Sequence, residues 1–162
     1  MPDQQLEPSP TAPTASRPGP TASPLAPTAS QLGTPTDSLT VLGRPVRHPI
    51  EHVECFPAPE HVSTVRFTTD ELASVCPVTG QPDLSHVVIE YEPDERCVES
   101  KSLKLYLWSF RDRPVFAEAL AAEIAAEVMT TAQPRRVTVT LTQHPRGGIE
   151  VEAVAILPAP PT

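Results

Sequence analysis

The stretch RPVFAEALAAEIAAEVMTTA, residues 113–132, decides the fold class, because its apolar residues recur with the period of an α-helix. Pro114 suits the first turn of this helix, where a missing N–H costs no hydrogen bond. We expect Glu123 and Glu127 to lie on the solvated face. The predicted buried stripe consists of Phe116, Leu120, Ile124 and Val128.

Alternating segments lie on both sides of this helix. Residues 61–69 and 85–93 precede it and residues 135–143 and 147–157 follow it, and each alternates as a strand does. In residues 99–112, apolar residues at i, i+3, i+4 and i+7 favour a second helix. The order strand, strand, helix, helix, strand, strand predicts an α+β domain, with two helices packed on one face of a four-stranded antiparallel sheet.

Three connections between these elements can be interpreted locally. The residues TTDEL, 68–72, predict a helical turn with Thr68 or Thr69 as its cap. Two prolines and a glycine make CPVTGQPD, residues 76–83, a loop. The segment HPRGG, residues 144–148, predicts a hairpin between the last two strands. Because a sheet this short leaves open edges, we expect it to join other subunits.

The composition divides the chain into a tail and one domain. Ten of the 22 prolines lie in the first 45 residues, among Thr, Ser and Ala. Such a segment buries too little apolar surface to offset its ordering entropy, so residues 1–48 are predicted to be disordered. Residues 49–158 form the predicted domain, and residues 159–162 a short C-terminal tail. A signal peptide and a membrane span are not expected.

Charge, cysteines and histidines limit the classes of function. The net charge of −8 lies mostly in the domain and argues against direct nucleic-acid binding. The cysteines Cys55, Cys76 and Cys97 are odd in number and lack metal spacing, which fits a reducing cytoplasm. His48 and His52 have the spacing of a helical ligand pair, but the proline between them disfavours that helix. We therefore predict no metal site.

The loop CPVTGQPD presents two readings of Cys76. A free cysteine is most often a small buried apolar residue, and no histidine stands nearby in the sequence to activate it. Reactive cysteines, however, occupy partly exposed polar turns of this kind. Asp83, seven residues further on, would then be its proton donor, although a lone aspartate is more often a turn residue.

The remaining candidates are charged residues. Lys101 and Lys104 stand at the start of a predicted helix, where backbone N–H groups and cations together can bind an anion. Arg146 precedes two glycines, which let a ligand approach the backbone closely. For all three, a solvated charged surface is the simpler reading. Glu118 lies in the first turn of the long helix, where the helix dipole favours a carboxylate. Neither a Rossmann nor a P-loop glycine motif is present.

Four of these segments together resemble one known family. CPVTGQPD, VESKSLKLYLWSFRD, FAEAL and PRGGI are similar to the QueF-type 7-cyano-7-deazaguanine reductases, over residues 71–154. The segment ESKSLKLY, residues 99–106, resembles that family's nicotinamide-binding signature. The compact length resembles its single-domain subtype. The resemblance implies the tunnelling fold, in which the sheets of a homo-oligomer join into a pentameric barrel, commonly stacked as a decamer.

The resemblance also implies a reaction and a substrate. The family reduces the nitrile of 7-cyano-7-deazaguanine to 7-aminomethyl-7-deazaguanine with two NADPH, in queuosine biosynthesis and hence in a tRNA modification pathway. Cys76 matches the nucleophile that forms a thioimidate, and Asp83 matches the proton donor. Glu118 matches the residue that grips the base, and Glu99 and Ser100 match residues lining the substrate pocket. The matching cofactor-binding residues are Lys101, Ser102, Lys104, Arg146 and Gly147.

One position departs from the family pattern. The residue before the base-binding glutamate is usually a histidine, and here it is Ala117, which cannot carry a proton. His144 or His61 of a neighbouring subunit could take its place, or the reaction could proceed without it. Two other functions stay open: a transferase that passes the thioimidate to a different nucleophile, and a deazapurine-binding module without turnover. Those transferases typically lack the nicotinamide signature, so reduction ranks first.

Overall fold

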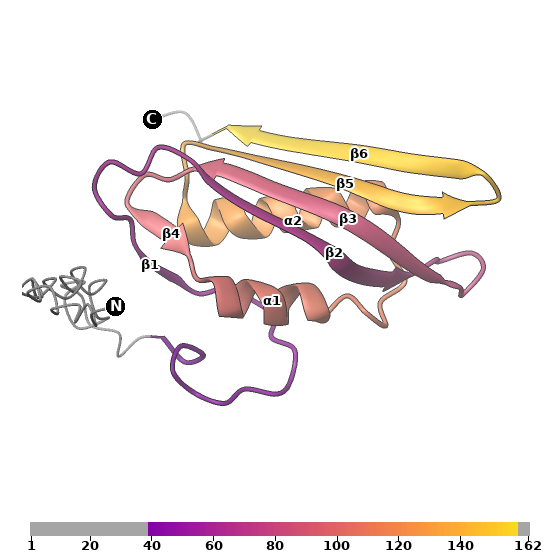
Figure 1. Ribbon diagram of the computed structural model, residues 1–162, viewed down its shortest axis with the longest axis horizontal. Helices are drawn as coiled ribbons and strands as arrows, with labels where there is room; N and C mark the ends of the chain where they lie inside the picture. The colour runs from indigo at the N-terminus through magenta and orange to yellow at the C-terminus, as the bar shows by residue number, and fades with distance from the viewer. Residues whose placement is uncertain (1–38, 159–162) are drawn as a thin grey trace, which may run out of the picture. The chain divides into compact units, whose positions relative to one another are not determined.

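A computed structural model describes residues 39–158 of the chain. This part of the chain contains two helices and six strands (Figure 1). In chain order they are β1 (Cys55–Pro57), β2 (Val65–Val75), β3 (Pro82–Glu92), β4 (Arg96–Val98), α1 (Ser100–Trp108), α2 (Ala117–Ala132), β5 (Arg136–Arg146) and β6 (Ile149–Pro158).

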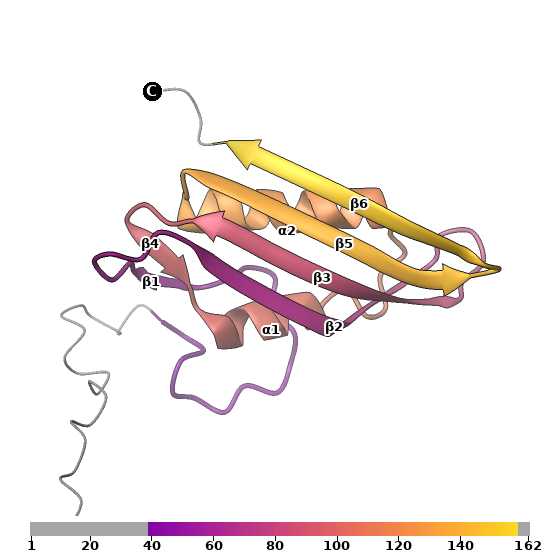
Figure 2. The same cartoon turned by 45° about the horizontal axis from the view of Figure 1, so that its top comes forward.

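The main sheet is antiparallel, with the strand order β2-β3-β5-β6. Both helices lie on the same face of this sheet, α1 along β2 and α2 across β5 and β6 (Figures 1 and 2). The short strands β1 and β4, which the sequence analysis missed, pair with each other at the edge of the helical layer. The predicted α+β architecture, four strands with two helices on one face, is confirmed.

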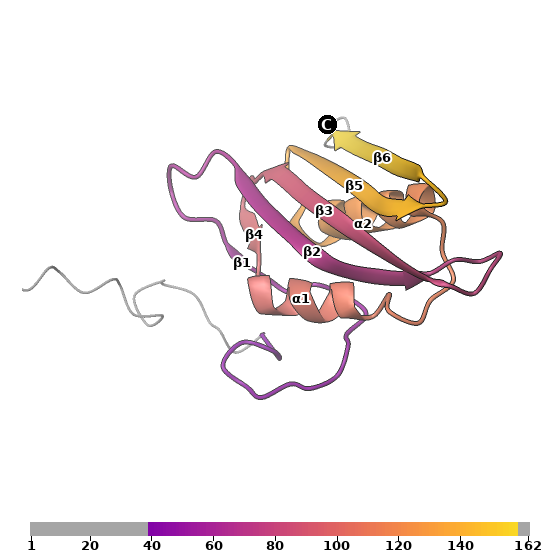
Figure 3. The same cartoon turned by 45° about the vertical axis from the view of Figure 1, so that its right-hand side comes forward.

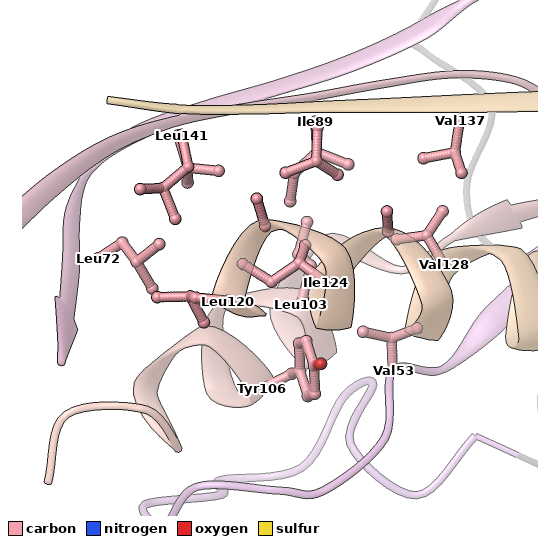
Figure 4. Packing of buried hydrophobic residues seen from close by; sticks show 14 of the residues in the cluster. Val53, Leu72, Ile89, Leu103, Tyr106, Leu120, Ile124, Val128, Val137 and Leu141 are labelled. Carbon is pink, nitrogen blue, oxygen red and sulfur yellow. The ribbon is translucent and has the colours of Figure 1, made fainter. Parts of the chain in front are cut away.

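Alternation along the strands decides which face the helices cover. In β3 every second side chain from Asp83 to Tyr91 is buried, while the intervening residues are more exposed. The buried residues of β5 follow the same pattern with Val137, Val139 and Leu141. These side chains point from the sheet toward Leu120, Ile124 and Val128 of α2, with Leu103 and Tyr106 of α1 beside them (Figure 4).

The predicted buried stripe of α2 is correct at three of its four positions. Phe116 is 55% exposed, because it is the N-cap residue in an extended conformation and its side chain does not continue the helical stripe. The buried position at this end of α2 belongs to Ala117. The helix therefore begins with a small residue packed inward and a large aromatic residue at the surface.

Glu127 is not on the solvated face. Its side chain is 12% exposed, and its carboxylate accepts hydrogen bonds from Val53 N (2.8 Å) and Thr131 Oγ1 (3.1 Å) and contacts His52 Nδ1 at 3.2 Å. The carboxylate thus fastens the chain before β1 to α2. Glu123 is more exposed, as predicted, and forms a fork of two hydrogen bonds with Arg113, at 2.8 and 3.0 Å.

The predicted helical turn at residues 68–72 is wrong. These residues belong to β2, and the pairing with β3 shifts between Thr69 and Leu72, which marks a β-bulge. The hydroxyl of Thr69 does accept a hydrogen bond from Glu71 N, as a helix cap would, at 3.1 Å. The hydrogen bond typical of a helix cap is therefore present, but pairing with β3 determines the conformation of this segment.

Part of the predicted tail contacts the domain. Leu39 and Val41 are buried, and the carboxylate of Glu54 accepts hydrogen bonds from Val41 N and from the backbone and hydroxyl of Thr40. Glu54 and, through its ammonium group, Lys101 of α1 thus hold residues 40–44 on the domain. The rest of the predicted N-terminal tail and residues 159–162 lie outside the described residues. Neither helix of residues 39–158 is long and apolar enough to cross a membrane.

The predicted hairpin between the last two strands is confirmed. Arg146 of β5 pairs with Ile149 of β6 across a turn of two glycines. Gly147 and Gly148 have φ angles of 59° and 82°, and positive φ at both central residues is the requirement of a type I′ turn. Side chains are strained in this conformation, so the turn depends on glycine.

Candidate active site

Four segments converge at one end of the main sheet. The loop of residues 76–81, the start of β3, the β5–β6 turn and the start of α2 all lie there, at the right of Figure 1 and again in Figure 3. Val75 N donates to Arg113 O and Val115 N donates to Val75 O, which brings the segment before α2 alongside β2. The guanidinium of Arg146 reaches across to Gln81, whose Oε1 accepts a hydrogen bond of 3.1 Å.

Cys76 begins the loop between β2 and β3. Its backbone N–H donates to Gln81 O and its carbonyl accepts from Gly80 N, both at 2.9 Å, so the loop is closed at its base. Gly80 has a φ of 67°, a conformation that glycine adopts without strain. The side chain of Cys76 is half-buried, neither packed in the core nor fully in solvent.

The surroundings of Cys76 favour its thiolate. Hydrogen bonds from the Thr79 hydroxyl, the Arg146 guanidinium and the backbone N–H groups of Thr79 and Val78 lower the pKa of Cys76 to about 6. Burial instead raises the pKa of Cys55 to about 11 and also raises the pKa of Cys97. Of the two readings left open by the sequence, this difference favours a reactive nucleophile at Cys76.

Asp83 is buried beside this thiolate site. It is 3% exposed, and its Oδ1 lies 2.7 Å from Arg146 Nη2. The two groups form an ion pair at that distance, but among residues 39–158 no donor is aligned for a hydrogen bond to Oδ1. A buried carboxylate oxygen without a hydrogen bond is costly in a folded protein, and such atoms concentrate where a ligand or a reaction uses them.

Glu118 and Ala117 begin α2 at the same end of the sheet. Glu118 is exposed in the first turn of the helix, where its carboxylate is free to meet a ligand. Ala117 is 6% exposed, so the position that carries a histidine in the resembled family points into the domain. His144, one of the two predicted substitutes, lies in β5 two residues before Arg146. His61 precedes β2 and lies toward the opposite end of that strand.

The predicted cofactor residues fall into two groups. Arg146 and Gly147 lie with Cys76 and Asp83, whereas Lys101 and Lys104 belong to α1, whose N-terminus follows β4 toward the other end of the sheet (Figure 1). A single chain therefore does not bring all of these cations together. In this chain, the Arg146 guanidinium forms its ion pair with the carboxylate of Asp83.

Glu99 and Ser102 support the start of α1. The carboxylate of Glu99 accepts hydrogen bonds from Lys101 N (2.8 Å) and Ser102 N (2.6 Å), which caps the helix. Ser102 is fully buried, and its hydroxyl donates to Glu99 O and accepts from Glu54 N. Within this chain, Glu99 and Ser102 therefore stabilise the start of α1, and the ligand contacts expected of both residues stay predictions.

Lys101 is also engaged by the protein. Its ammonium group donates to Val41 O (2.8 Å) and Arg44 O, so it anchors the N-terminal segment on α1. Ser100 and Lys104 are exposed and line a groove of about 910 Å³ between α1 and the edge strand β2. Leu103 of the same signature segment also lines this groove.

Two residues of this groove were missed by the sequence analysis. Trp108 is 40% exposed, and it lines the groove together with Arg111 and Lys104. The three residues stand at i, i+4 and i+7, the spacing of one side of a helix; Lys104 and Trp108 belong to α1, and Arg111 lies in the turn that follows it. This spacing was the available signal, and it was hidden because the same segment also carries the apolar pattern of Leu103 and Phe110. Within residues 39–158 no three metal-ligating side chains cluster.

Comparison with a solved structure identifies the class of fold. The crystal structure of an archaeosine synthase QueF-Like in the apo form superimposes with a TM-score of 0.57 at 32% sequence identity. The match covers 60% of this chain and 95% of that one. With two helices on one face of an antiparallel sheet, the domain has the tunnelling fold.

Sequence comparison gives the family. The model of the family described as QueF-like protein matches residues 82–160. The NADPH-dependent 7-cyano-7-deazaguanine reductase of Alkalilimnicola ehrlichii is 44% identical over 109 residues, 66% of this chain and 84% of that protein. The protein of that name from Granulibacter bethesdensis is 39% identical over 129 residues, 76% of this chain and 84% of the relative. The chain belongs to the QueF-like family.

The activation of Cys76 gives a prediction that needs no substrate. Iodoacetamide should alkylate Cys76 with a rate that rises through a midpoint near pH 6, because the thiolate is the reacting form. Cys55 serves as the internal control, since its thiol should stay unreactive at neutral pH. Peptide mass spectrometry after timed quenching measures both rates, and equal rates at pH 7 would contradict the assignment.

Proposed function

We propose that this protein reduces the nitrile of 7-cyano-7-deazaguanine to 7-aminomethyl-7-deazaguanine, with NADPH as reductant and Cys76 as nucleophile. The observation that carries the proposal is the arrangement of Cys76, Arg146 and Asp83 at the end of the sheet. The names of the relatives support the substrate and the cofactor. The product would serve queuosine or related 7-deazapurine biosynthesis in the cytoplasm.

The first step is the addition of Cys76 to the nitrile. The sulfur forms a bond to the nitrile carbon, one π bond of the C≡N group breaks, and the nitrogen takes a proton from Asp83. The product is a thioimidate, and nothing is released from the substrate. The half-buried position of Cys76 suits this role, because a small planar substrate can reach the sulfur. The two backbone hydrogen bonds at the base of the loop keep the Cys76 backbone in place.

Glu118 is the proposed anchor of the base. Its carboxylate can accept two hydrogen bonds side by side, one from a ring N–H and one from the exocyclic amine of the deazaguanine. Its place in the first turn of α2 supports this role, since the carboxylate is exposed at the same end of the sheet as Cys76. Recognition of the base and attack on the nitrile would then come from neighbouring elements.

The groove beside α1 fits a dinucleotide cofactor. Lys104 and Arg111 supply cations for phosphate groups, Trp108 supplies an aromatic face, and Ser100 supplies a hydroxyl. NADPH would supply the hydrides, two in total, that convert the C=N stage to the amine. Lys101 can join this set only after it releases the carbonyl oxygens of Val41 and Arg44.

Assembly into a homo-oligomer is part of the proposal. β2 and β6 are the outer strands of the sheet. Within the described chain one edge of β6 is unpaired, and the outer edge of β2 is bridged at Val75 by the segment before α2. Pairing of such edges between copies would close a barrel of five subunits, alone or stacked as ten. It would also bring the α1 groove of one copy to the Cys76 end of another. A single chain does not bring these two parts of the site together.

A transferase on the same nitrile is the second candidate. Ala117 favours it, because the family's usual histidine is missing beside the base-binding glutamate. The likeness to an archaeosine synthase supports it as well. In that reaction the thioimidate would form on Cys76 as before and then accept a different nucleophile in place of hydride. A binding module without turnover is the remaining alternative. The transferase and the binding module would both need Glu118 to bind the base.

Reductant stoichiometry separates these functions. Purified protein mixed with 7-cyano-7-deazaguanine and NADPH should oxidise two NADPH per nitrile consumed, followed by nicotinamide absorbance and by chromatography of the product. The Cys76→Ala variant should show no oxidation, because the thioimidate cannot form. Nitrile consumption without NADPH oxidation would favour the transferase, and neither signal would leave the binding module.

The proposed cofactor groove is tested by Lys104. Its replacement by glutamine should raise the KM for NADPH about tenfold, because one charge-assisted phosphate contact is lost. The alkylation rate of Cys76 should not change, since Lys104 lies in the α1 group. Arg136→Gln is the matched control, an exposed cation at the start of β5 outside the groove. An unchanged KM in Lys104→Gln would place the phosphates elsewhere.

A further inference from the structure

We propose that Arg146 is a positioning residue of the reacting centre, which holds the single negative charge of the site as that charge passes from Cys76 to Asp83. The inference rests on the proposed function and gives Arg146 a role different from the phosphate anchor that the resemblance implies.

The guanidinium lies between the two reacting groups. Its Nη2 is 2.7 Å from the buried Oδ1 of Asp83, and its Nη1 donates to Gln81 Oε1 at 3.1 Å. The same guanidinium contributes to lowering the pKa of the Cys76 thiol, after the Thr79 hydroxyl. The side chain of Arg146 is 38% exposed, whereas that of Asp83 is 3% exposed, so the cation closes the site from its solvent side.

A β-bulge aims Arg146 at this site. Gln143 pairs with Val151, but Arg146 pairs with Ile149, so β5 carries one extra residue between these two pairs. In a regular strand Arg146 would point away from the face that carries Val139, Leu141 and the buried side chains of β3. The extra residue reverses the alternation and turns Arg146 toward the face of Asp83. The glycine turn that follows then fixes the end of the strand.

The charge balance of the addition explains why a cation belongs at this place. The proposed step requires a proton on Asp83 at its start, in place of the negative charge that this carboxylate has in its ion pair with Arg146, and the negative charge is then on the Cys76 thiolate. The sulfur forms its bond to carbon and becomes neutral, the nitrogen takes the proton, and Asp83 becomes the carboxylate. The net charge of the site is unchanged, but the charge has moved from sulfur to oxygen. Arg146 favours the thiolate at the start and pairs with the Asp83 carboxylate at the end, so the cation stabilises the negative charge before and after the transfer.

The test uses the intact protein without nitrile or cofactor. Replacing Arg146 by glutamine should slow the alkylation of Cys76 by iodoacetamide about tenfold at pH 6.5, because the thiolate loses a charged partner. At pH 9 the variant and the wild type should react at similar rates. Arg146→Lys keeps the positive charge but lacks the planar guanidinium, so its Cys76 alkylation rate at pH 6.5 should lie between those of the wild type and Arg146→Gln. Arg136→Gln, on the same strand, is the matched control.

Direct binding of NADPH, measured by titration calorimetry, distinguishes the two roles of Arg146. The inference predicts that Arg146→Gln binds NADPH within about threefold of the wild-type affinity. Unchanged alkylation combined with weakened NADPH binding would overturn it and restore the phosphate-anchor role. A shift in alkylation in a protein that oxidises no NADPH would support the inference while the proposed function fails. Circular dichroism of both variants verifies that they are folded.

Discussion

The contact between the Arg146 guanidinium and the buried carboxylate of Asp83 is the interaction on which the candidate site depends. It joins the end of β5 to the start of β3 across the mouth of the Cys76 loop. Thr79 and this cation lower the pKa of the Cys76 thiol, and the cation also offsets the cost of burying a carboxylate. In the proposed reaction, one cation would therefore serve both the nucleophile and the proton donor.

A second set of interactions orders the other half of the site. Glu99 caps α1, and Glu54 and Lys101 hold residues 40–44 against its first turn. This framework presents Lys104 and Trp108 to the groove beside β2, away from Cys76. The proposed assembly of several copies would bring the groove of one chain to the Cys76 end of another.

Much of this fold can be predicted from the sequence because strand alternation and helical periodicity are local signals, and the four main strands and α2 followed from them. Long-range pairing decided what the sequence did not reveal. The bulge in β2 replaced the helical turn expected at Thr69, and the bulge in β5 brings Arg146, an expected cofactor residue, beside Asp83. Cys76 and Asp83 were identifiable by resemblance, but the activation of the thiol required coordinates.

The most direct test of the account is the intact mass of the protein after incubation with 7-cyano-7-deazaguanine in the absence of NADPH. The account predicts a gain equal to the mass of the whole nitrile, because addition of the thiol releases nothing. Peptide mapping should locate that gain on Cys76, and the Cys76→Ala variant should not show it. An unmodified protein, or a modification on Cys55 or Cys97, would contradict the claim that Cys76 is the nucleophile.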